Sequence, residues 1–379
     1  MRALLFTASL TFFFACGGGT SPVVDGGSGG GSTGGTGGGA TGGGSAGGGG
    51  GSVTGGGTGG GSVTGGGTGG GAVTGGGTGG GTADAGTVGP TGCVSDVTAG
   101  HHSFSCDSIT YEVEIPTACT SGGCGVVFDV HGATMNAAAQ DKSTGLRATA
   151  GALGYVVVQP TAPMVFGYRS WTPSTDDPKV WTFLQQVVTA LALNPKKVHF
   201  TGFSQGGAMT YRMLCAHADV LASVAPVAAA DGQTLSALTP PFVLDCAFTG
   251  SNLPSQQIPI LQMHGTADGL VPFAKAQQQR DATISAWSLG SPTPVASDAK
   301  YAHTRYISPT GTVVEFIQHD YVAPGSLLLV NLGGHCLPGG QDLPPGGTPN
   351  TNLYFSCAQP NGFTWGEQVM QFFVAHPRP

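Results

Sequence analysis

Charged residues are scarce in this chain, and basic residues are scarcer than acidic ones. Only 9% of the residues are charged, with 13 Lys and Arg against 20 Asp and Glu, so the formal net charge is −7. No run of basic residues occurs anywhere in the sequence. Because a nucleic-acid partner requires clustered Lys and Arg, we exclude that class of partner.

Long apolar runs are missing after the first 16 residues. No later stretch approaches the roughly 18 consecutive apolar residues that a bilayer-spanning helix needs, so we expect no such helix. Residues 1–16 have the pattern of a signal peptide instead, since a single Arg precedes a short apolar run that ends at Ala15 and Cys16.

The end of that segment, Phe13 to Cys16, resembles the bacterial lipobox, in which a small residue precedes a cysteine that becomes acylated. The alternative is cleavage by an ordinary signal peptidase, with Cys16 incidental. On the first interpretation lipid chains on Cys16 hold the protein at a membrane, and this anchor is its only membrane contact. We therefore predict an exported protein, either lipid-anchored at the bacterial cell surface or secreted.

Residues 17–92 contain most of the 69 glycines and almost no large side chains. The pattern Val-Thr-Gly-Gly-Gly-Thr-Gly-Gly-Gly repeats from Val53, Val63 and Val73. The segment lacks the Gly-X-Y period of collagen, and none of its glycines precedes the lysine of a phosphate-binding loop. Because nothing in it forms a core, we predict a disordered tether with an end-to-end distance of roughly 50 Å.

The cysteine count indicates an oxidising compartment. Of the nine cysteines, eight remain when Cys16 is set aside, and an even number in an exported protein fits up to four disulfides. These eight are Cys93, Cys106, Cys119, Cys124, Cys215, Cys246, Cys336 and Cys357. Their order favours Cys215 with Cys246 and Cys336 with Cys357. Zinc is the competing interpretation, but the one short cysteine spacing has no second matched pair, so we expect no metal and no cofactor.

Residues 93–379 alternate between short β-branched runs and helix-forming stretches. The expected strands are 110–115, 126–131, 155–159, 197–201, 222–227 and 258–264. The expected helices are 144–153, 180–193, 206–216, 274–287 and 365–375. Strands that alternate with helices are typical of a mostly parallel sheet covered on both faces. We therefore predict one α/β domain over residues 93–379.

The sharpest motif is Gly202-Phe203-Ser204-Gln205-Gly206, which follows a β-run and precedes a helix-forming stretch. That context is typical of a nucleophile elbow, a strained turn that lifts a serine hydroxyl above a sheet. Ser204 is thus the candidate nucleophile, and the N–H of Gln205 is a candidate oxyanion donor near the positive end of the helix. The alternative is a tight turn with a capping serine.

A serine hydroxyl needs a base and an orienting acid, which follow it in the order acid, then base, in this type of fold. Asp268 comes just after an apolar run, on a loop that belongs at the carboxyl end of a strand. Asp231 and Asp245 are alternatives, although Asp231 lies close to the strand after the elbow helix and Asp245 lies inside an apolar run. We predict Asp268 as the acid.

His335 is the candidate base, because it follows a β-run on a Gly-rich loop that is able to reach Ser204. His319, at the end of another strand, is the runner-up. His264 and His131 also end strands, but each precedes a glycine, so both are predicted to shape turns.

A second oxyanion donor belongs on a loop after an early strand. The stretch His131-Gly132-Ala133-Thr134 follows such a strand, and its glycine permits a tight turn. The N–H of Ala133 is therefore the candidate donor.

Four segments together resemble the polyhydroxybutyrate depolymerase-like esterases, an α/β-hydrolase group close to the feruloyl and acetylxylan esterases of carbohydrate esterase family 1. These segments, in the family's order, are 131–134, 202–207, 264–268 and 333–340. The resemblance implies the α/β-hydrolase fold, with Ser204 as nucleophile, Asp268 as orienting acid and His335 as base. This chain departs from the family at Leu337, where members commonly carry Trp.

These residues predict a serine esterase that hydrolyses carboxylic esters through an acyl-enzyme. The tether favours a polymeric substrate, such as feruloylated or acetylated polysaccharide or polyhydroxyalkanoate, and no protein partner is implied. One alternative is a lipase or serine peptidase of the same fold. Another is a non-catalytic binding protein on that fold, although binding-only descendants usually lose a triad member and none is missing here.

Overall fold

The computed structural model describes residues 86–230, 246, 248, 252–327, 329–341 and 355–379. All of them belong to one compact unit, Thr78–Pro379. The predicted signal peptide, Cys16 and the tether up to residue 85 lie outside the described residues. Within the described ranges no helix is both long and apolar enough to span a membrane.

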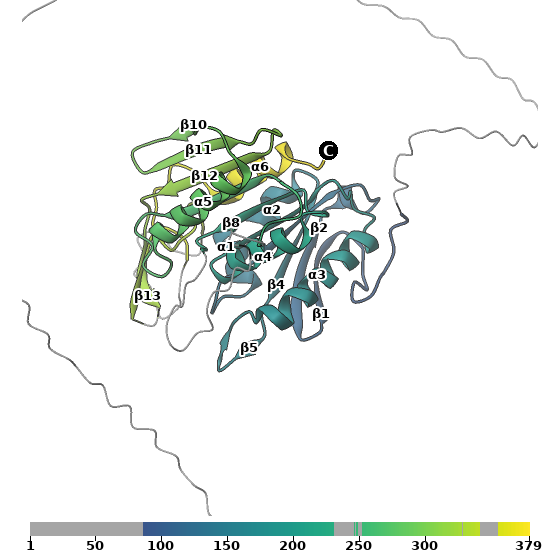
Figure 1. Ribbon diagram of the computed structural model, residues 1–379. Helices are drawn as coiled ribbons and strands as arrows, with labels where there is room; N and C mark the ends of the chain where they lie inside the picture. Colours follow the sequence, from purple (N-terminus) through teal and green to yellow (C-terminus); the bar gives the residue numbers. More distant parts are fainter. Residues whose placement is uncertain (1–85, 231–245, 247, 249–251, 328, 342–354) are drawn as a thin grey trace, which may run out of the picture. The chain divides into compact units, whose positions relative to one another are not determined.

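A ten-stranded sheet forms the centre of the described unit, in the order β1-β2-β4-β3-β7-β8-β9-β12-β11-β10 (Figure 1). Its strands are β1 (Gly100–Cys106), β2 (Ile109–Ile115), β3 (Gly125–Val130), β4 (Tyr155–Thr161), β7 (Val198–Phe203), β8 (Ser223–Val227), β9 (Ile260–Gly265), β10 (Thr293–Ser297), β11 (Tyr301–Ile307) and β12 (Val313–His319). Two hairpins lie apart from it, β5 (Met164–Val165) with β6 (Tyr168–Arg169), and β13 (Ala323–Leu327) with β14 (Val330–Gly333).

The helices are α1 (Ala137–Thr144), α2 (Leu146–Gly151), α3 (Pro173–Ala190), α4 (Gln205–His217), α5 (Phe273–Trp287) and α6 (Trp365–Ala375), with one 3-10 turn at Thr117–Cys119. The predicted strands and helices all occur, with boundaries shifted by a few residues. The exception is α3, which begins at Pro173 rather than at 180. Proline suits the first helical position, and the Asp176 carboxylate accepts a hydrogen bond from the Thr172 N–H at 2.7 Å.

Six neighbouring strands of the described sheet, from β4 to β12, are parallel. Antiparallel pairs extend the sheet at both edges, β1 with β2 and β10 with β11. The chain places β4 on one side of β3 and β7 on the other, so the winding direction reverses at β3. In open α/β sheets ligands bind beyond the carboxyl ends of the strands at such a reversal, which here means the loops after β3 and β7.

Helices cover both faces of the sheet, and alternate residues of each parallel strand enter two separate cores. Val126 and Phe128 of β3 belong to the core that also contains residues of α3 and α4, whereas Val127 between them packs with residues of α2 and α6. Burial on both faces is typical of parallel sheets. The predicted α/β class is therefore confirmed.

Four disulfides lie within the described residues, and they join Cys93 to Cys106, Cys119 to Cys124, Cys215 to Cys246, and Cys336 to Cys357. The two pairs that the sequence favours are thus confirmed. The folded unit contacts itself before the first of these cysteines, since the N–H of Gly89 donates to the carbonyl of Ala190 at 2.8 Å. The described chain is therefore in contact with the domain a few residues before the predicted boundary at 92.

Candidate active site

Ser204 occupies the junction between β7 and α4 in a backbone conformation that L-residues rarely adopt, with φ 55° and ψ −114°. Two hydrogen bonds hold this turn, because its N–H donates to Val227 and its carbonyl accepts from Ala208, both at 2.9 Å. A positive φ at a serine between a strand and a helix is the geometry of the nucleophile elbow.

The glycines of the motif are required by close contact between backbones. A Cβ at Gly206 would overlap the carbonyl of Val130 on β3, and a Cβ at Gly202 would overlap the carbonyl of Gly206. At Gly207 an added Cβ would lie 2.5 Å from the carbonyl of Val227. The elbow is thus pressed against the strands on both sides of β7, and any side chain larger than hydrogen would displace it.

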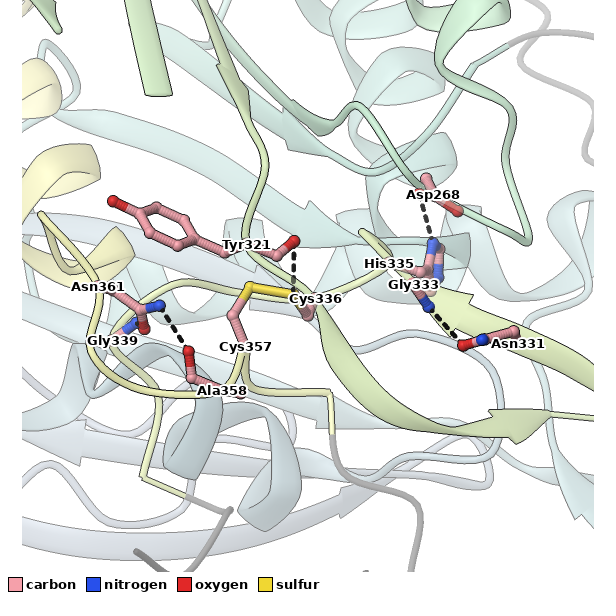
Figure 2. The surroundings of a disulfide bond; sticks show 10 residues. All are labelled: Asp268, Tyr321, Asn331, Gly333, His335, Cys336, Gly339, Cys357, Ala358 and Asn361. Carbon is pink, nitrogen blue, oxygen red and sulfur yellow. Dashed lines mark hydrogen bonds and ion pairs between the residues drawn. A yellow bond between two sulfur atoms is a disulfide. The ribbon is translucent and has the colours of Figure 1, made fainter. Parts of the chain in front are cut away.

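The candidate acid and base lie side by side, as Figure 2 shows. Since a carboxylate only accepts, Nδ1–H of His335 donates to Oδ2 of Asp268, at 2.8 Å. The other oxygen, Oδ1, accepts from the N–H groups of Leu270 and Val271 at 2.9 and 2.8 Å. Both side chains are buried. The carboxylate therefore fixes the imidazole with Nε2 left unprotonated and able to accept.

A second imidazole contacts the same carboxylate. Nε2 of His264 lies 2.8 Å from the carbonyl oxygen of Val271 and 3.3 Å from Oδ2 of Asp268. Burial by itself raises the pKa of Asp268, but the charge of His335 and hydrogen bonds from His264 and His335 outweigh it, so the pKa lies well below its ordinary value. The sequence predicted only a turn-shaping role for His264, because nothing local shows that its ring reaches the acid.

The loop of His335 is tied down on its other side by the disulfide of the next residue (Figure 2). Leu337 N–H donates to the carbonyl of Phe355 at 2.7 Å, and Cys357 N–H donates to the carbonyl of Leu337 at 2.9 Å. Covalent and hydrogen-bonded links therefore fix the segment that carries the base.

Phe203 connects the base to the nucleophile, because its ring centroid lies 4.7 Å from that of His335 and it directly precedes Ser204. The Ser204 hydroxyl makes no hydrogen bond to another described residue. In free enzymes this bond is often long and tightens only when substrate binds. The structure thus brings Ser204, Asp268 and His335 together in one small region.

The candidate oxyanion donors flank Ser204. A Cβ built on Gly132 would lie 3.0 Å from Cβ of Ser204, so the loop after β3 packs directly against the nucleophile. In that loop Thr134 N–H donates to Arg169 at 2.8 Å, whereas Ala133 N–H has no partner among the described residues. The N–H of Gln205 lies in the first turn of α4, where helical amides lack an intrahelical acceptor. Both predicted amides are therefore available as donors.

His131 and Trp171 hold this loop in place. Nδ1–H of His131 donates to the carbonyl of Gly132 at 2.6 Å, and Nε2 accepts from Ala162 N–H at 2.9 Å. Burial lowers the pKa of His131 to about 4, so the ring is neutral at pH 7. Trp171 Nε1–H donates to the carbonyl of His131 at 2.9 Å. The residue predicted to shape a turn thus shapes the loop of an oxyanion donor.

The other candidates for acid and base do not join the pair. His319 is buried at the end of β12, its carbonyl accepts from Thr266 N–H at 2.8 Å, and burial lowers its pKa to about 4. Neither of its ring nitrogens has a hydrogen-bond partner among the described residues. Asp231 and Asp245 lie outside the described residues.

Part of the chain also matches a known protein family. Residues 174–317, which include the elbow and Asp268, match the phospholipase/carboxylesterase family model. The described domain has the α/β-hydrolase fold. The chain is 33% identical over 152 residues to a protein assigned as esterase NocK, from Nocardia uniformis subsp. tsuyamanensis. That match spans 38% of this chain and 40% of NocK.

Two solved structures are similar in part. Acetyl xylan esterase from Aspergillus awamori has a TM-score of 0.44 at 14% identity, over 55% of this chain and 87% of that enzyme. Est1E from Butyrivibrio proteoclasticus has a TM-score of 0.36 at 12% identity, over 48% and 85%. At such scores the likeness carries no argument about the substrate. The finer resemblance to polyhydroxybutyrate depolymerase-like esterases stays a prediction.

Proposed function

We propose that this α/β-hydrolase is a serine esterase that cleaves carboxylic esters through an acyl-enzyme. The observation that carries the proposal is the strained Ser204 elbow, packed through Phe203 against an imidazole that Asp268 fixes at 2.8 Å. A strained serine, an imidazole and an ionised carboxylate together provide a nucleophile, a base and an orienting group.

In the first half-reaction Oγ of Ser204 attacks the ester carbonyl carbon while Nε2 of His335 takes the hydroxyl proton. The carbonyl oxygen becomes negatively charged, and the N–H groups of Gln205 and Ala133 donate hydrogen bonds to it. The C–O bond to the alcohol then breaks. The departing alkoxide receives the proton from His335, and the acyl group stays on Ser204.

In the second half-reaction a water molecule attacks the acyl carbon and gives its proton to His335. The Ser204 ester bond breaks, the proton returns to Oγ, and the carboxylic acid leaves. Asp268 stays ionised throughout, since its pKa lies well below the ordinary value, and it stabilises the imidazolium that forms twice in each cycle.

The substrate that we propose is a polymeric ester outside the cell, either feruloylated or acetylated polysaccharide or a polyhydroxyalkanoate. Export is supported by the pattern of residues 1–16 and by the disulfides of the described domain, since disulfides persist in oxidising compartments. The Gly-rich segment supports an enzyme that reaches out from a membrane to an insoluble substrate.

The deciding experiment compares the full-length protein, produced with its disulfides, with the Ser204→Ala variant on p-nitrophenyl acetate and butyrate. We expect turnover by the wild type and a loss of at least about a thousandfold in kcat for Ser204→Ala. Equal turnover by both proteins, or none by folded wild type, would overturn the proposal. The second outcome would leave a non-catalytic binding protein.

Substrate class is tested next with methyl ferulate, acetylated xylan and polyhydroxybutyrate as the proposed ester types. A long-chain triglyceride emulsion and a peptide p-nitroanilide serve as the lipase and peptidase comparisons. Faster hydrolysis of either comparison substrate would contradict the proposed polymer.

A further inference from the structure

A pocket of about 410 Å³ opens next to the loop that carries Ala133. Its walls come from β1 and β2 at the sheet edge, from the end of β4, from Arg169 on β6 and from the first residues of α1 and α2. None of its lining residues belongs to the proposed triad. Its most prominent polar groups are two guanidinium groups, those of Arg147 and Arg169.

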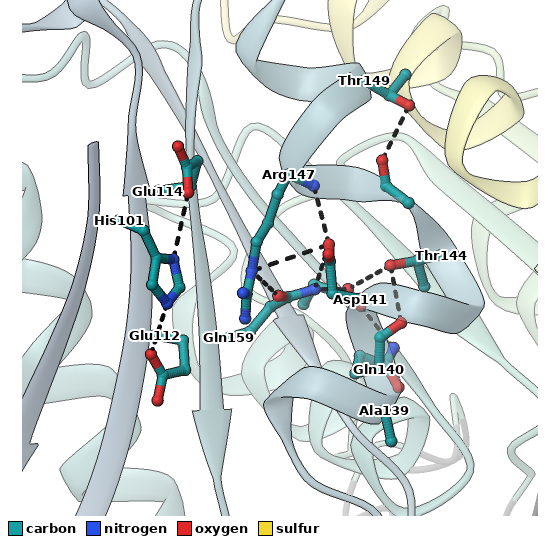
Figure 3. A network of polar contacts seen from close by, with 12 residues as sticks. His101, Glu112, Glu114, Ala139, Gln140, Asp141, Thr144, Arg147, Thr149 and Gln159 are labelled. Carbon is teal, nitrogen blue, oxygen red and sulfur yellow. Dashed lines mark hydrogen bonds and ion pairs between the residues drawn. The ribbon is translucent and has the colours of Figure 1, made fainter. Parts of the chain in front are cut away.

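Arg147 carries a donor that nothing in the described structure satisfies. Its Nε–H donates to Oε1 of Gln159 at 2.6 Å and lies 3.9 Å from Oδ1 of Asp141 (Figure 3). These contacts fix the plane of the guanidinium group. The Nη2 atom is buried and has no hydrogen-bond partner among the described residues. A buried donor without an acceptor is costly.

Arg169 supplies a second fixed positive charge. Its Nη1 donates to the carbonyl of Ala162 at 2.8 Å, and it forms no ion pair with a described residue. Its own carbonyl accepts from Thr134, next to Ala133, so its backbone is bound to the oxyanion loop. The guanidinium group of Arg169 therefore lines the pocket without a counter-charge among the described residues, on a backbone that is bound to the oxyanion loop.

The positive end of α1 faces the same pocket. Asn136 caps this helix by accepting from Ala139 N–H at 2.9 Å, and Ala137 N–H donates to the Thr161 hydroxyl at 3.1 Å. Ala138 also lines the pocket, and its N–H has no partner among the described residues. Backbone amides and the helix dipole thus add to the attraction for an anion.

One acidic residue, Glu112, also lines the pocket, but its carboxylate is already engaged. It lies 2.8 Å from Nε2 of His101 and accepts from the Ser103 hydroxyl at 3.1 Å, while Glu114 lies 3.2 Å from Nδ1 of the same His101 (Figure 3). Arg147 is paired with Asp141, and Glu112 has partners of its own, so Arg169 is the cation of this lining that has no ion pair among the described residues.

We propose that this pocket binds a carboxylate group of the ester substrate, so that the enzyme prefers acidic esters. The inference rests on the proposed esterase function and narrows its substrate class. A planar carboxylate matches the fork of an arginine and is able to accept from both guanidinium groups. Asn136 is three residues from Ala133, so its Cα lies at most about 11 Å from that of the oxyanion donor. The carboxylate is thus a short chain away from the scissile ester.

The kinetic test uses mono-p-nitrophenyl suberate and p-nitrophenyl octanoate, which differ in a terminal carboxylate. In Arg169→Met we expect kcat/KM for the suberate ester to fall about tenfold more than kcat/KM for the octanoate ester, mostly through KM. Arg169→Lys restores part of the loss. The matched control is Arg378→Met, the same change in the C-terminal segment, which alters neither substrate. Equal effects of Arg169→Met on both esters would overturn the proposal.

Arg147 tests the same site from the opposite wall. Because Arg147 also holds Gln159, Arg147→Met is compared with the wild type by thermal unfolding before the kinetics are measured. We expect the same selective loss of suberate activity in a protein that stays folded. If Arg147→Met does not fold, the Arg169→Met result decides.

A binding experiment separates this inference from the proposed function. Suberate is titrated calorimetrically into Ser204→Ala and into Ser204→Ala with Arg169→Met, and we expect binding to weaken about tenfold in the second protein. Ester turnover without suberate binding would overturn the pocket and leave the esterase. Suberate binding without any ester turnover would keep the pocket and overturn the esterase. Tighter binding of inorganic phosphate at the same arginine would overturn the assignment to carboxylate.

Discussion

Nε2 of His264 lies 3.3 Å from Oδ2 of Asp268, the same oxygen that accepts from Nδ1 of His335 at 2.8 Å. The acid is therefore held between two imidazoles, one that faces the nucleophile and one that is buried behind it. Because His264 also points at the carbonyl of Val271, it joins the acid to its own loop. We infer that His264 is a positioning residue for Asp268.

Removing that contact is expected to move the acid limb of the pH profile. In His264→Leu the burial of Asp268 is opposed by one imidazole fewer, so the pKa of Asp268 rises toward its ordinary value. Asp268 then takes up a proton at a higher pH, and kcat/KM for p-nitrophenyl butyrate falls earlier as the pH is lowered. His264→Gln, which keeps a donor, restores part of the profile, and His376→Leu is the control. Superimposable profiles of the wild type and His264→Leu would contradict this role.

Asp129 is expected to make stability depend on pH. Gln140, Thr144 and Gln159 each donate a hydrogen bond to its buried carboxylate, yet burial dominates and raises its pKa from 3.8 to about 6. A carboxyl group whose pKa is raised in the folded state stabilises it below the unfolded pKa, and this contribution is lost as the pH rises through the folded pKa.

The test compares urea unfolding of the wild type and Asp129→Asn between pH 4 and pH 7. A shift of about two pKa units corresponds to roughly 3 kcal/mol, so the free energy of unfolding of the wild type should fall relative to Asp129→Asn by up to that amount. A constant difference between the two proteins across this range would show that Asp129 does not titrate there.

The disulfide next to the base is expected to matter for catalysis as well as for stability. Loss of a native disulfide typically lowers the free energy of unfolding by about 2–5 kcal/mol. We expect this for Cys336→Ser with Cys357→Ser and equally for the control, Cys93→Ser with Cys106→Ser. Only the first pair should also lower kcat, by about tenfold, because it frees the segment that carries His335. Stopped-flow and steady-state assays on folded samples compare kcat between the two double variants, and equal kcat values would contradict the prediction.

The proposed anchor is tested in a bacterial host by membrane fractionation and mass spectrometry. We expect full-length protein in the membrane fraction, with lipid on Cys16, and release of Cys16→Ser into the soluble exported fraction. Membrane association that survives Cys16→Ser would favour the ordinary signal peptidase alternative with another means of attachment.

Local patterns in the sequence were sufficient for the parallel core. Strands β3, β4, β7, β8 and β9 are short, mostly apolar runs buried on both faces, and α6 has the predicted bounds, 365–375. In contrast, α1 was missed because the residues that it buries include Gln140, Ser143 and Thr144, which give no apolar period. Strand β10 was missed because all its residues are exposed, so it shows no alternation between buried and exposed positions.

The candidate site likewise contains residues that the sequence predicts and contacts that it does not. Ser204, Asp268 and His335 were predicted because each has a characteristic local context and their order along the chain is restricted by the fold. The contact of His264 with the acid and the convergence of Arg147 with Arg169 depend on how loops far apart in the sequence meet. No spacing or composition signal in the chain contains that information.

At Gly202, Gly206 and Gly207 the elbow of Ser204 is in close contact with other main-chain atoms, with no room for a side chain. Any substitution at these glycines adds a side chain where main-chain atoms already touch, so we expect every such substitution to displace the elbow. We therefore expect new substrate preferences to arise from changes in the surrounding loops, with these three glycines unchanged. Directed-evolution libraries of this protein should therefore vary the loops around Ser204 and leave the three glycines unchanged.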